Sequence, residues 1–366
     1  MRQQTLSSFV KEAGLPADIG TTSDGKITIE TILHEKKTFD LSLSFEKLGV
    51  GGKDRDWTDH APVKPTIVES LPNRSNILSV SVFDLLLPSA GEVKQYIAVT
   101  TADRRLHLLD PTTSKLELAH SYSSFQDSPS LDVVTVGTRY LLVASMSGKM
   151  TLFDVADGTS IDERQDHSKY LVKLAVWAHG ASYLIASAGW DAKIFLYQLD
   201  VNADCPQLGK PLAMLTLPSI PETMMFVASP EDGSPMLVVA RRDSTFLHYY
   251  AMPTADHPGL TLLGKQNLAP HSNAWIAFTP SDIQLSPVDP HLAAVATSST
   301  PHMKLLVVKL LLPPIHSSVL DAEADQGPVG PVTQTSQARA ELVTAEREEA
   351  AILVNVSTLA PQTSCT

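Results

Sequence analysis

The chain has 366 residues, of which 43% are hydrophobic and 19% are charged, and its formal net charge is −12. This balance is ordinary for a globular protein, while the negative field disfavours a nucleic-acid partner and the short apolar runs disfavour a membrane-spanning segment. Two cysteines, Cys205 and Cys365, argue against a disulfide framework or a Cys/His zinc site. Because the first 25 residues also lack an apolar signal-peptide core, we expect an intracellular protein, cytoplasmic or nuclear.

The first predicted element is a short N-terminal α-helix. Its apolar positions have the i, i+3, i+4, i+7 spacing of one helical face: Leu6, Phe9, Val10 and Ala13. Gly14 and Pro16 then provide a C-terminal stop signal. A helix this short is marginal alone, so the apolar stripe needs a surface to cover it.

The same segment resembles the second half of a LisH motif, with Leu6, Phe9 and Glu12 at the matching positions. The resemblance implies that residues 1–18 form a partial LisH-like helix that supports a homodimer. The motif's first helix would precede Met1, so we expect this self-association to be weakened. Residues 19–64 contain turn residues and few long apolar runs, and are interpreted as a linker.

From about residue 65 onward, short strand-like segments recur in pairs around a tight turn. The turns fall at similar positions, with spacings of 44, 44 and 52 residues: Asp103, Ser147, Asp191 and Asp243. A fifth, looser unit runs from His291 to Leu310. A strand–turn–strand repeat of about 40–45 residues is the signature of a propeller blade, which buries its two faces only by stacking on its neighbours.

The third unit resembles the internal motif of the WD-repeat (WD40) family. His167 precedes the first strand, Ser187 is in the second, Asp191 is in the turn, and Tyr197 stands where the family usually has Trp. The resemblance implies that these four side chains form a hydrogen-bonded chain that ties the turn of the blade to its loop. The literal Trp190-Asp191 pair belongs to the turn and is not the family's terminal Trp-Asp pair.

We therefore expect an all-β fold: residues 65–366 form a β-propeller of four-stranded antiparallel blades. About five blades are recognisable, and we expect an incomplete or irregular ring. A polar insertion at about 316–349 interrupts the fifth unit and ends in a short surface helix. Strand-like sequence resumes from Ala351 to Leu359. The run of Glu346, Glu348 and Glu349 is interpreted as a solvated helix face.

No motif for a nucleophile elbow, a phosphate loop or a zinc protease is present, so we expect no catalytic residue, cofactor or metal. A trio of Ser187, His167 and Asp191 could serve as a nucleophilic triad, but its repeat positions favour a structural role. The predicted function is a non-enzymatic scaffold in a multiprotein complex. Its loops would bind other proteins, and its N-terminal helix would support self-association. The alternative is a small-ligand or enzymatic propeller with a site in its central channel.

Overall fold

The computed structural model describes residues 68–357, apart from 89, 114, 124, 181, 204, 271–277, 299–302 and 315–342. All of them lie in the second of two units, Ile67–Thr366. The predictions for residues 1–18, including Leu6, Phe9 and Glu12, and for the linker at 19–64 lie outside the described residues. The incompleteness of the ring stays a prediction, because it also depends on residues outside these ranges.

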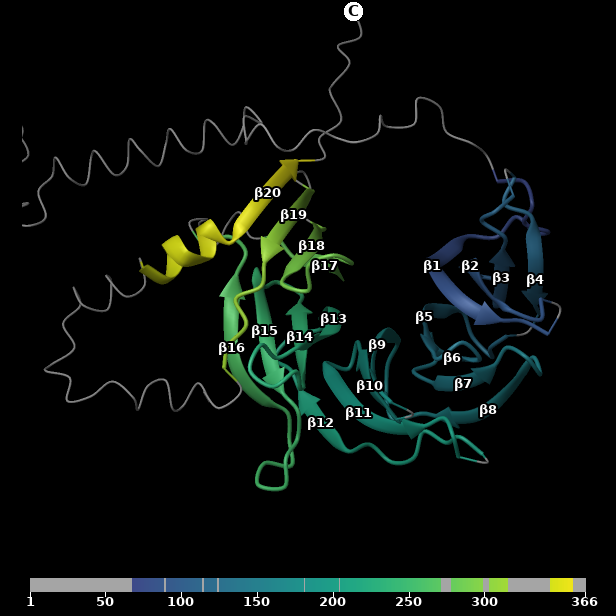
Figure 1. Ribbon diagram of the computed structural model, residues 1–366, viewed down its shortest axis with the longest axis horizontal. Helices are drawn as coiled ribbons and strands as arrows, with labels where there is room; N and C mark the ends of the chain where they lie inside the picture. Colours follow the sequence, from purple (N-terminus) through teal and green to yellow (C-terminus); the bar gives the residue numbers. More distant parts are fainter. Residues whose placement is uncertain are drawn as a thin grey trace, which may run out of the picture. The chain divides into compact units, whose positions relative to one another are not determined.

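The described residues form five four-stranded antiparallel sheets, or blades, that follow one another in chain order (Figure 1). Blade 1 contains β1 (Ile77–Leu86), β2 (Val93–Thr101), β3 (Arg105–Leu109) and β4 (Leu118–Tyr122). Blade 2 contains β5 (Ser130–Val136), β6 (Tyr140–Ser145), β7 (Met150–Asp154) and β8 (Thr159–Arg164). Blade 3 contains β9 (Leu171–His179), β10 (Ser182–Gly189), β11 (Lys193–Asp200) and β12 (Ala213–Thr216).

Blade 4 contains β13 (Pro221–Ala228), β14 (Pro235–Arg241), β15 (Phe246–Ala251) and β16 (Thr261–Asn267). Blade 5 contains β17 (Pro280–Leu285), β18 (Leu292–Thr297), β19 (Lys304–Lys309) and β20 (Ile352–Ser357). The innermost strands contact each other in the order β1, β5, β9, β13, β17, and the fourth strand of each blade lies on the outside (Figure 1). The predicted β-propeller of four-stranded antiparallel blades is confirmed.

The hydrophobic core consists of layers between successive blades, because the middle strands are apolar on both faces. In β6, Leu141 and Val143 pack toward blade 1, while Leu142 and Ala144 pack toward blade 3. The side chains of a strand alternate between its two faces, so an unbroken apolar run is what a strand between two neighbours requires. The layers between blades 3 and 4 and between blades 4 and 5 have the same form.

The turn between the second and third strands recurs in blades 1 to 4. Each turn contains one residue with positive φ: Arg104 (65°), Gly148 (82°), Ala192 (59°) and Asp243 (58°). In blade 3 the last strand pair, Ala188 with Ile194, encloses five residues, whereas Ala240 with Leu247 in blade 4 encloses six. Asp191 and Asp243 keep the equivalence that the sequence predicted, because each lies three residues beyond a matching strand pair, Ala188 with Lys173 in blade 3 and Ala240 with Thr223 in blade 4. The extra residue of the blade 4 turn therefore follows Asp243.

A helix over residues 343–350 leads into β20, which agrees with the predicted surface helix and the resumed strand. The interpretation of its glutamates as a fully solvated face was wrong for Glu348. That side chain is buried, and its Oε1 accepts the backbone N–H of Asn267 at 2.7 Å. This hydrogen bond joins the helix to β16, the outer strand of blade 4, between residues that are 81 positions apart.

Candidate functional site

The turns between the second and third strands of blades 1 to 4 gather at one end of the blades, and we call this end the turn face. Contacts between neighbouring blades run through it. Arg104 of blade 1 donates from Nη1 to the carbonyl oxygen of Asp127 at 3.3 Å. The guanidinium of Arg242 in blade 4 lies 5.6 Å from the ring centre of Trp190 in blade 3.

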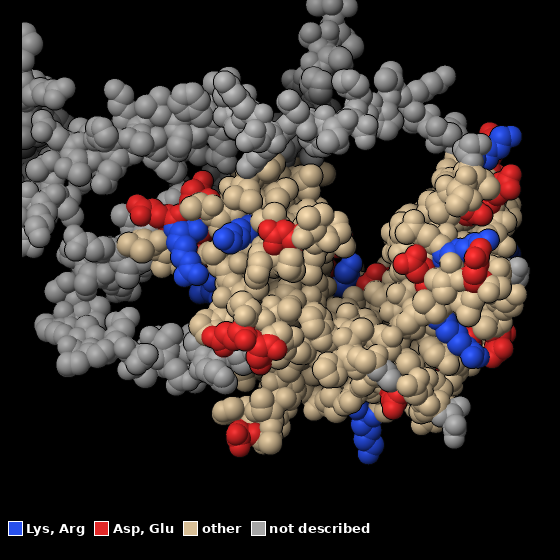
Figure 2. Space-filling model, viewed as in Figure 1, with Lys and Arg blue, Asp and Glu red and all other residues tan. Residues whose placement is uncertain are grey.

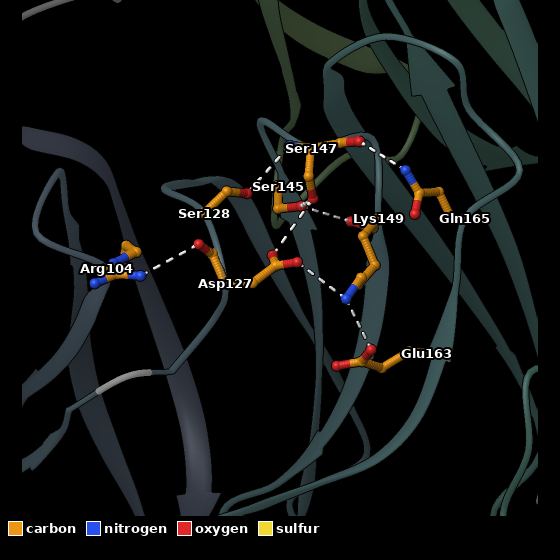
Figure 3. Close-up of polar contacts among 8 residues, drawn as sticks. All are labelled: Arg104, Asp127, Ser128, Ser145, Ser147, Lys149, Glu163 and Gln165. Carbon is orange, nitrogen blue, oxygen red and sulfur yellow. Dashed lines mark hydrogen bonds and ion pairs between the residues drawn. The ribbon is translucent and has the colours of Figure 1, made fainter.

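The blade 2 turn is held by a network of polar side chains that runs from buried Ser145 to exposed Asp127 and Glu163 (Figure 3). Lys149 lies between two carboxylates, at 3.0 Å from Asp127 and 2.9 Å from Glu163, and these contacts raise the pKa of Lys149. The hydroxyls of Ser145 and Ser147 are 2.8 Å apart. Because these groups satisfy one another, the network stabilises the turn and leaves no group poised for chemistry. Exposed ion pairs of this kind contribute at most about 1 kcal/mol each.

The structure brings three of the four predicted network residues of blade 3 together around His167. His167 lies 3.0 Å from Asp191 Oδ1 through its Nδ1 and 2.9 Å from Ser187 Oγ through its Nε2. The backbone N–H of Ser168 donates to the second oxygen of Asp191 at 3.0 Å. A buried carboxylate is tolerated when it is paired in this way.

Burial and hydrogen bonding set the charges of this cluster. Burial lowers the pKa of His167 more than the neighbouring Asp191 raises it, so the imidazole is neutral at pH 7. For Asp191, burial acts to raise the pKa, but the hydrogen bonds from His167 and the Ser168 N–H hold it below its usual value. The spacing is that of a nucleophilic triad, yet Ser187 is 0% exposed within the sheet, so no substrate can reach its hydroxyl.

Tyr197 interacts with Ser187 and with a residue that sequence reasoning missed. Burial raises the pKa of Tyr197, while the hydrogen bond with Ser187 acts to lower it. The Tyr197 hydroxyl donates to Asp166 Oδ2 at 3.0 Å. Asp166 in turn forms a two-bond ion pair with Arg164, at 2.9 and 2.7 Å. Asp166 directly precedes His167 in the sequence, so its position indicated that it could belong to the same network.

Replacing Asp191 with alanine should lower the free energy of unfolding by about 1–3 kcal/mol, because the substitution leaves His167 and the Ser168 N–H without an acceptor. Urea unfolding of the full chain measures this. Asp256→Ala is the control, since Asp256 is an exposed aspartate in blade 4. Equal midpoints for the two variants would place Asp191 outside any stabilising network.

Two exposed aromatic side chains and an arginine form a patch on the turn face, which we call the aromatic patch (Tyr170, Trp190 and Arg242). Tyr170 is 42% exposed and Trp190 is 38% exposed, and their ring centres are 5.0 Å apart. The backbone N–H of Trp190 donates to the carbonyl of Tyr170 at 2.8 Å. Arg242 is held in place by an ion pair with Glu222.

A second polar cluster lies on the innermost strands. Each of these strands has a bulge in its pairing, and the residue after it occupies an equivalent position in every blade: Ser79, Asp132, Lys173, Thr223 and Asp282. Lys173 Nζ lies 3.3 Å from Asp282 Oδ1, which links blade 3 to blade 5. Buried Asp132 accepts the backbone N–H of Leu174 at 2.8 Å. We call these five positions the inner belt.

An inter-blade cavity of about 400 Å³ lies between blades 1 and 2. Tyr122, Phe125 and Phe153 contribute aromatic rings to its lining, and the Tyr122 hydroxyl donates to the carbonyl of Val155 at 2.8 Å. Within the described ranges, no group of three His, Cys, Asp or Glu side chains is placed to hold a metal ion. No helix in the described part of the chain is long and apolar enough to cross a membrane.

The charge on the face drawn in Figure 2 occurs as small mixed groups of Lys, Arg, Asp and Glu separated by uncharged surface. A protein that follows a nucleic-acid backbone uses a continuous positive surface. The described residues on this face do not form one.

A protein-family comparison matches residues 72–365 to the family described as "UCP007778, beta-propeller domain". The chain belongs to this β-propeller family. The match begins after the segment with the LisH resemblance, so Leu6, Phe9 and Glu12 lie outside it. No curated protein sequence matches the chain.

Among solved structures, the chain is similar to Sqt1 of Saccharomyces cerevisiae, with 15% identity and a TM-score of 0.45. The similarity covers 64% of this chain and 60% of Sqt1, so it spans less than two thirds of that protein.

Proposed function

We propose that this propeller is a non-enzymatic scaffold of WD-repeat type that binds partner proteins through its turn face. The aromatic patch is the observation that carries the proposal. Exposed Trp, Tyr and Arg side chains on a rigid support are the residues that dominate the energy of protein interfaces. Tyr170 and Trp190 come from one blade and Arg242 from the next, so a partner would bind across the junction of two blades.

The patch is preorganised, which favours binding because little conformational freedom remains to be lost. The backbone of Arg242 is fixed on both sides: its N–H donates to the carbonyl of Ile220 at 2.8 Å, and its carbonyl accepts from the Ser219 hydroxyl at 3.0 Å. Rigid loops on a propeller scaffold are a common place for binding residues.

Trp190→Ala should remove partner proteins that the wild-type full chain captures from a cell extract, with at least about a thirtyfold loss of affinity for each direct partner. Quantitative affinity purification of both chains measures this loss. The control is Val288→Ala, because Val288 is a 90% exposed apolar residue in blade 5. Unchanged capture by a folded Trp190→Ala chain would remove the patch from the proposal.

Two parts of the proposal depend on the sequence. The apolar stripe of Leu6 and Phe9, with Glu12, supports weak self-association of the chain through a LisH-like helix. The low cysteine content supports an intracellular location, cytoplasmic or nuclear, and Cys205 is exposed and free.

A small-ligand or enzymatic propeller is the second candidate, and the inner belt is the observation that favours it. Lys173, Asp282 and Asp132 place charge close together on the innermost strands. We rank this candidate second because each of these groups already has a partner within the chain. The Trp190→Ala substitution separates the two functions, since it changes the turn face and leaves the inner belt intact.

A further inference from the structure

Two lysines lie close to Tyr170 and Trp190 in the sequence. Lys169 is exposed and directly precedes Tyr170, and Lys193 is half-buried at the start of β11, three residues after Trp190. Neither forms an ion pair with any residue that the structure describes. Both ammonium groups are therefore available to a partner.

The carboxylates around the patch are mostly neutralised from within the chain. Glu222 is paired with Arg242. Asp191 is buried and accepts hydrogen bonds from His167 and from the Ser168 N–H. Asp243 is exposed and makes no ion pair within the described residues. The groups left without a partner are thus two cations and one carboxylate, on a chain whose net charge is −12.

We propose that the aromatic patch recognises an acidic protein segment that carries an aromatic or large aliphatic side chain. This inference rests on the proposed function and specifies the partner. The apolar side chain would pack on Tyr170 and Trp190, and carboxylates on either side of it would meet Lys169 and Lys193. Complementary charge of this kind raises the association rate and rejects partners of the wrong sign.

Other polymers fit the patch less well. A basic segment would meet Lys169 and Lys193 with like charge. Single-stranded RNA could stack its bases on the aromatic rings, but it also needs a positive track along its backbone. The net charge of −12 works against such a track.

Fluorescence anisotropy with three labelled probes tests the inference on the full chain. The probes are the peptide Asp-Glu-Trp-Glu-Asp, the peptide Lys-Arg-Trp-Arg-Lys and an oligouridine of similar length. Each is titrated at about 50 mM and about 300 mM NaCl, because screening weakens charge pairs at the surface. We expect the acidic peptide to bind at least about tenfold more tightly than the basic one at low salt, and to lose that advantage at high salt.

The variants separate the contribution of charge from that of the rings. Lys169→Glu should weaken the acidic peptide at least about tenfold and strengthen the basic one. The matched control is Lys210→Glu, which changes an exposed lysine in the loop between β11 and β12. This substitution should leave both affinities unchanged. The peptide affinities of Lys193→Glu are measured in the same way as those of Lys169→Glu. Thermal unfolding of both variants checks that each chain is folded. Trp190→Ala should weaken all peptides that contain tryptophan.

Each outcome decides the inference. Tighter binding of the basic peptide or of oligouridine overturns it, and so does the absence of any acidic-peptide binding. If Trp190→Ala removes captured proteins while neither peptide charge nor Lys169→Glu affects binding, the proposed function stands and the acidic partner does not. If Trp190→Ala affects neither captured proteins nor peptides, the proposed function itself has failed.

Discussion

Gly148→Ala should lower the free energy of unfolding by about 2–5 kcal/mol. Gly148 has a φ of +82°, a conformation that costs any other L-residue about 1–2 kcal/mol. An added Cβ would also lie less than 3.0 Å from the carbonyl oxygens of His167 and Lys169. These are backbone atoms of the loop that holds the blade 3 network and Tyr170, so they cannot move without disturbing both.

Urea unfolding of the full chain measures this loss, and Gly233→Ala separates its two causes. Gly233 also has a positive φ, +72°, but an added Cβ there meets nothing within 4 Å. Its substitution should therefore cost only the backbone term, about 1–2 kcal/mol. If the two variants unfold at the same midpoint, the steric clash of the added Cβ with the carbonyl oxygens of His167 and Lys169 contributes nothing to the loss of stability.

Asp132→Asn should stabilise the chain by about 1–3 kcal/mol at pH 7.5. Burial raises the pKa of Asp132 to about 6, against the opposing effects of Lys173 and the Leu174 N–H. The folded chain therefore favours the protonated acid. The stability that protonated Asp132 contributes is fully present below the unfolded pKa of 3.8 and is lost as the pH rises through about 6. Asparagine removes the buried charge and keeps an oxygen that can accept the Leu174 N–H.

The difference in unfolding free energy between Asp132→Asn and wild type should thus grow as the pH rises from about 4 to about 7.5. Urea titrations at several pH values measure it. Asp256→Asn serves as the reference for an exposed aspartate, and its difference should stay flat. A flat difference for Asp132→Asn, or a stabilisation that shrinks toward neutral pH, would show that Asp132 ionises freely in the folded chain.

The sequence by itself determined the blades, because their information is local. A strand pair and its turn lie within about twenty residues, and each carries its own signals of alternation and turn chemistry. The turns at Asp103, Ser147 and Asp191 were therefore found at a constant spacing of 44 residues. The resemblance to the WD-repeat motif, and not the local pattern, implied that His167, Ser187 and Asp191 are neighbours, and the structure brings them into contact. Their contact also needs Gly189, where a Cβ would collide with the His167 ring.

Only the tertiary structure decided which side chains meet across blades and which of them are buried. Trp190 and Arg242 lie in different repeats, and Lys173 and Asp282 are 109 positions apart. The apolar pattern of one strand carries no information on how the next blade is oriented relative to that strand. Burial has the same origin: Asp132 lies in an innermost strand and Glu348 in a charged helix, and packing from distant strands removed both from water. Local pattern fixes the elements, whereas contacts and pKa values depend on surfaces that come together only in the assembled propeller.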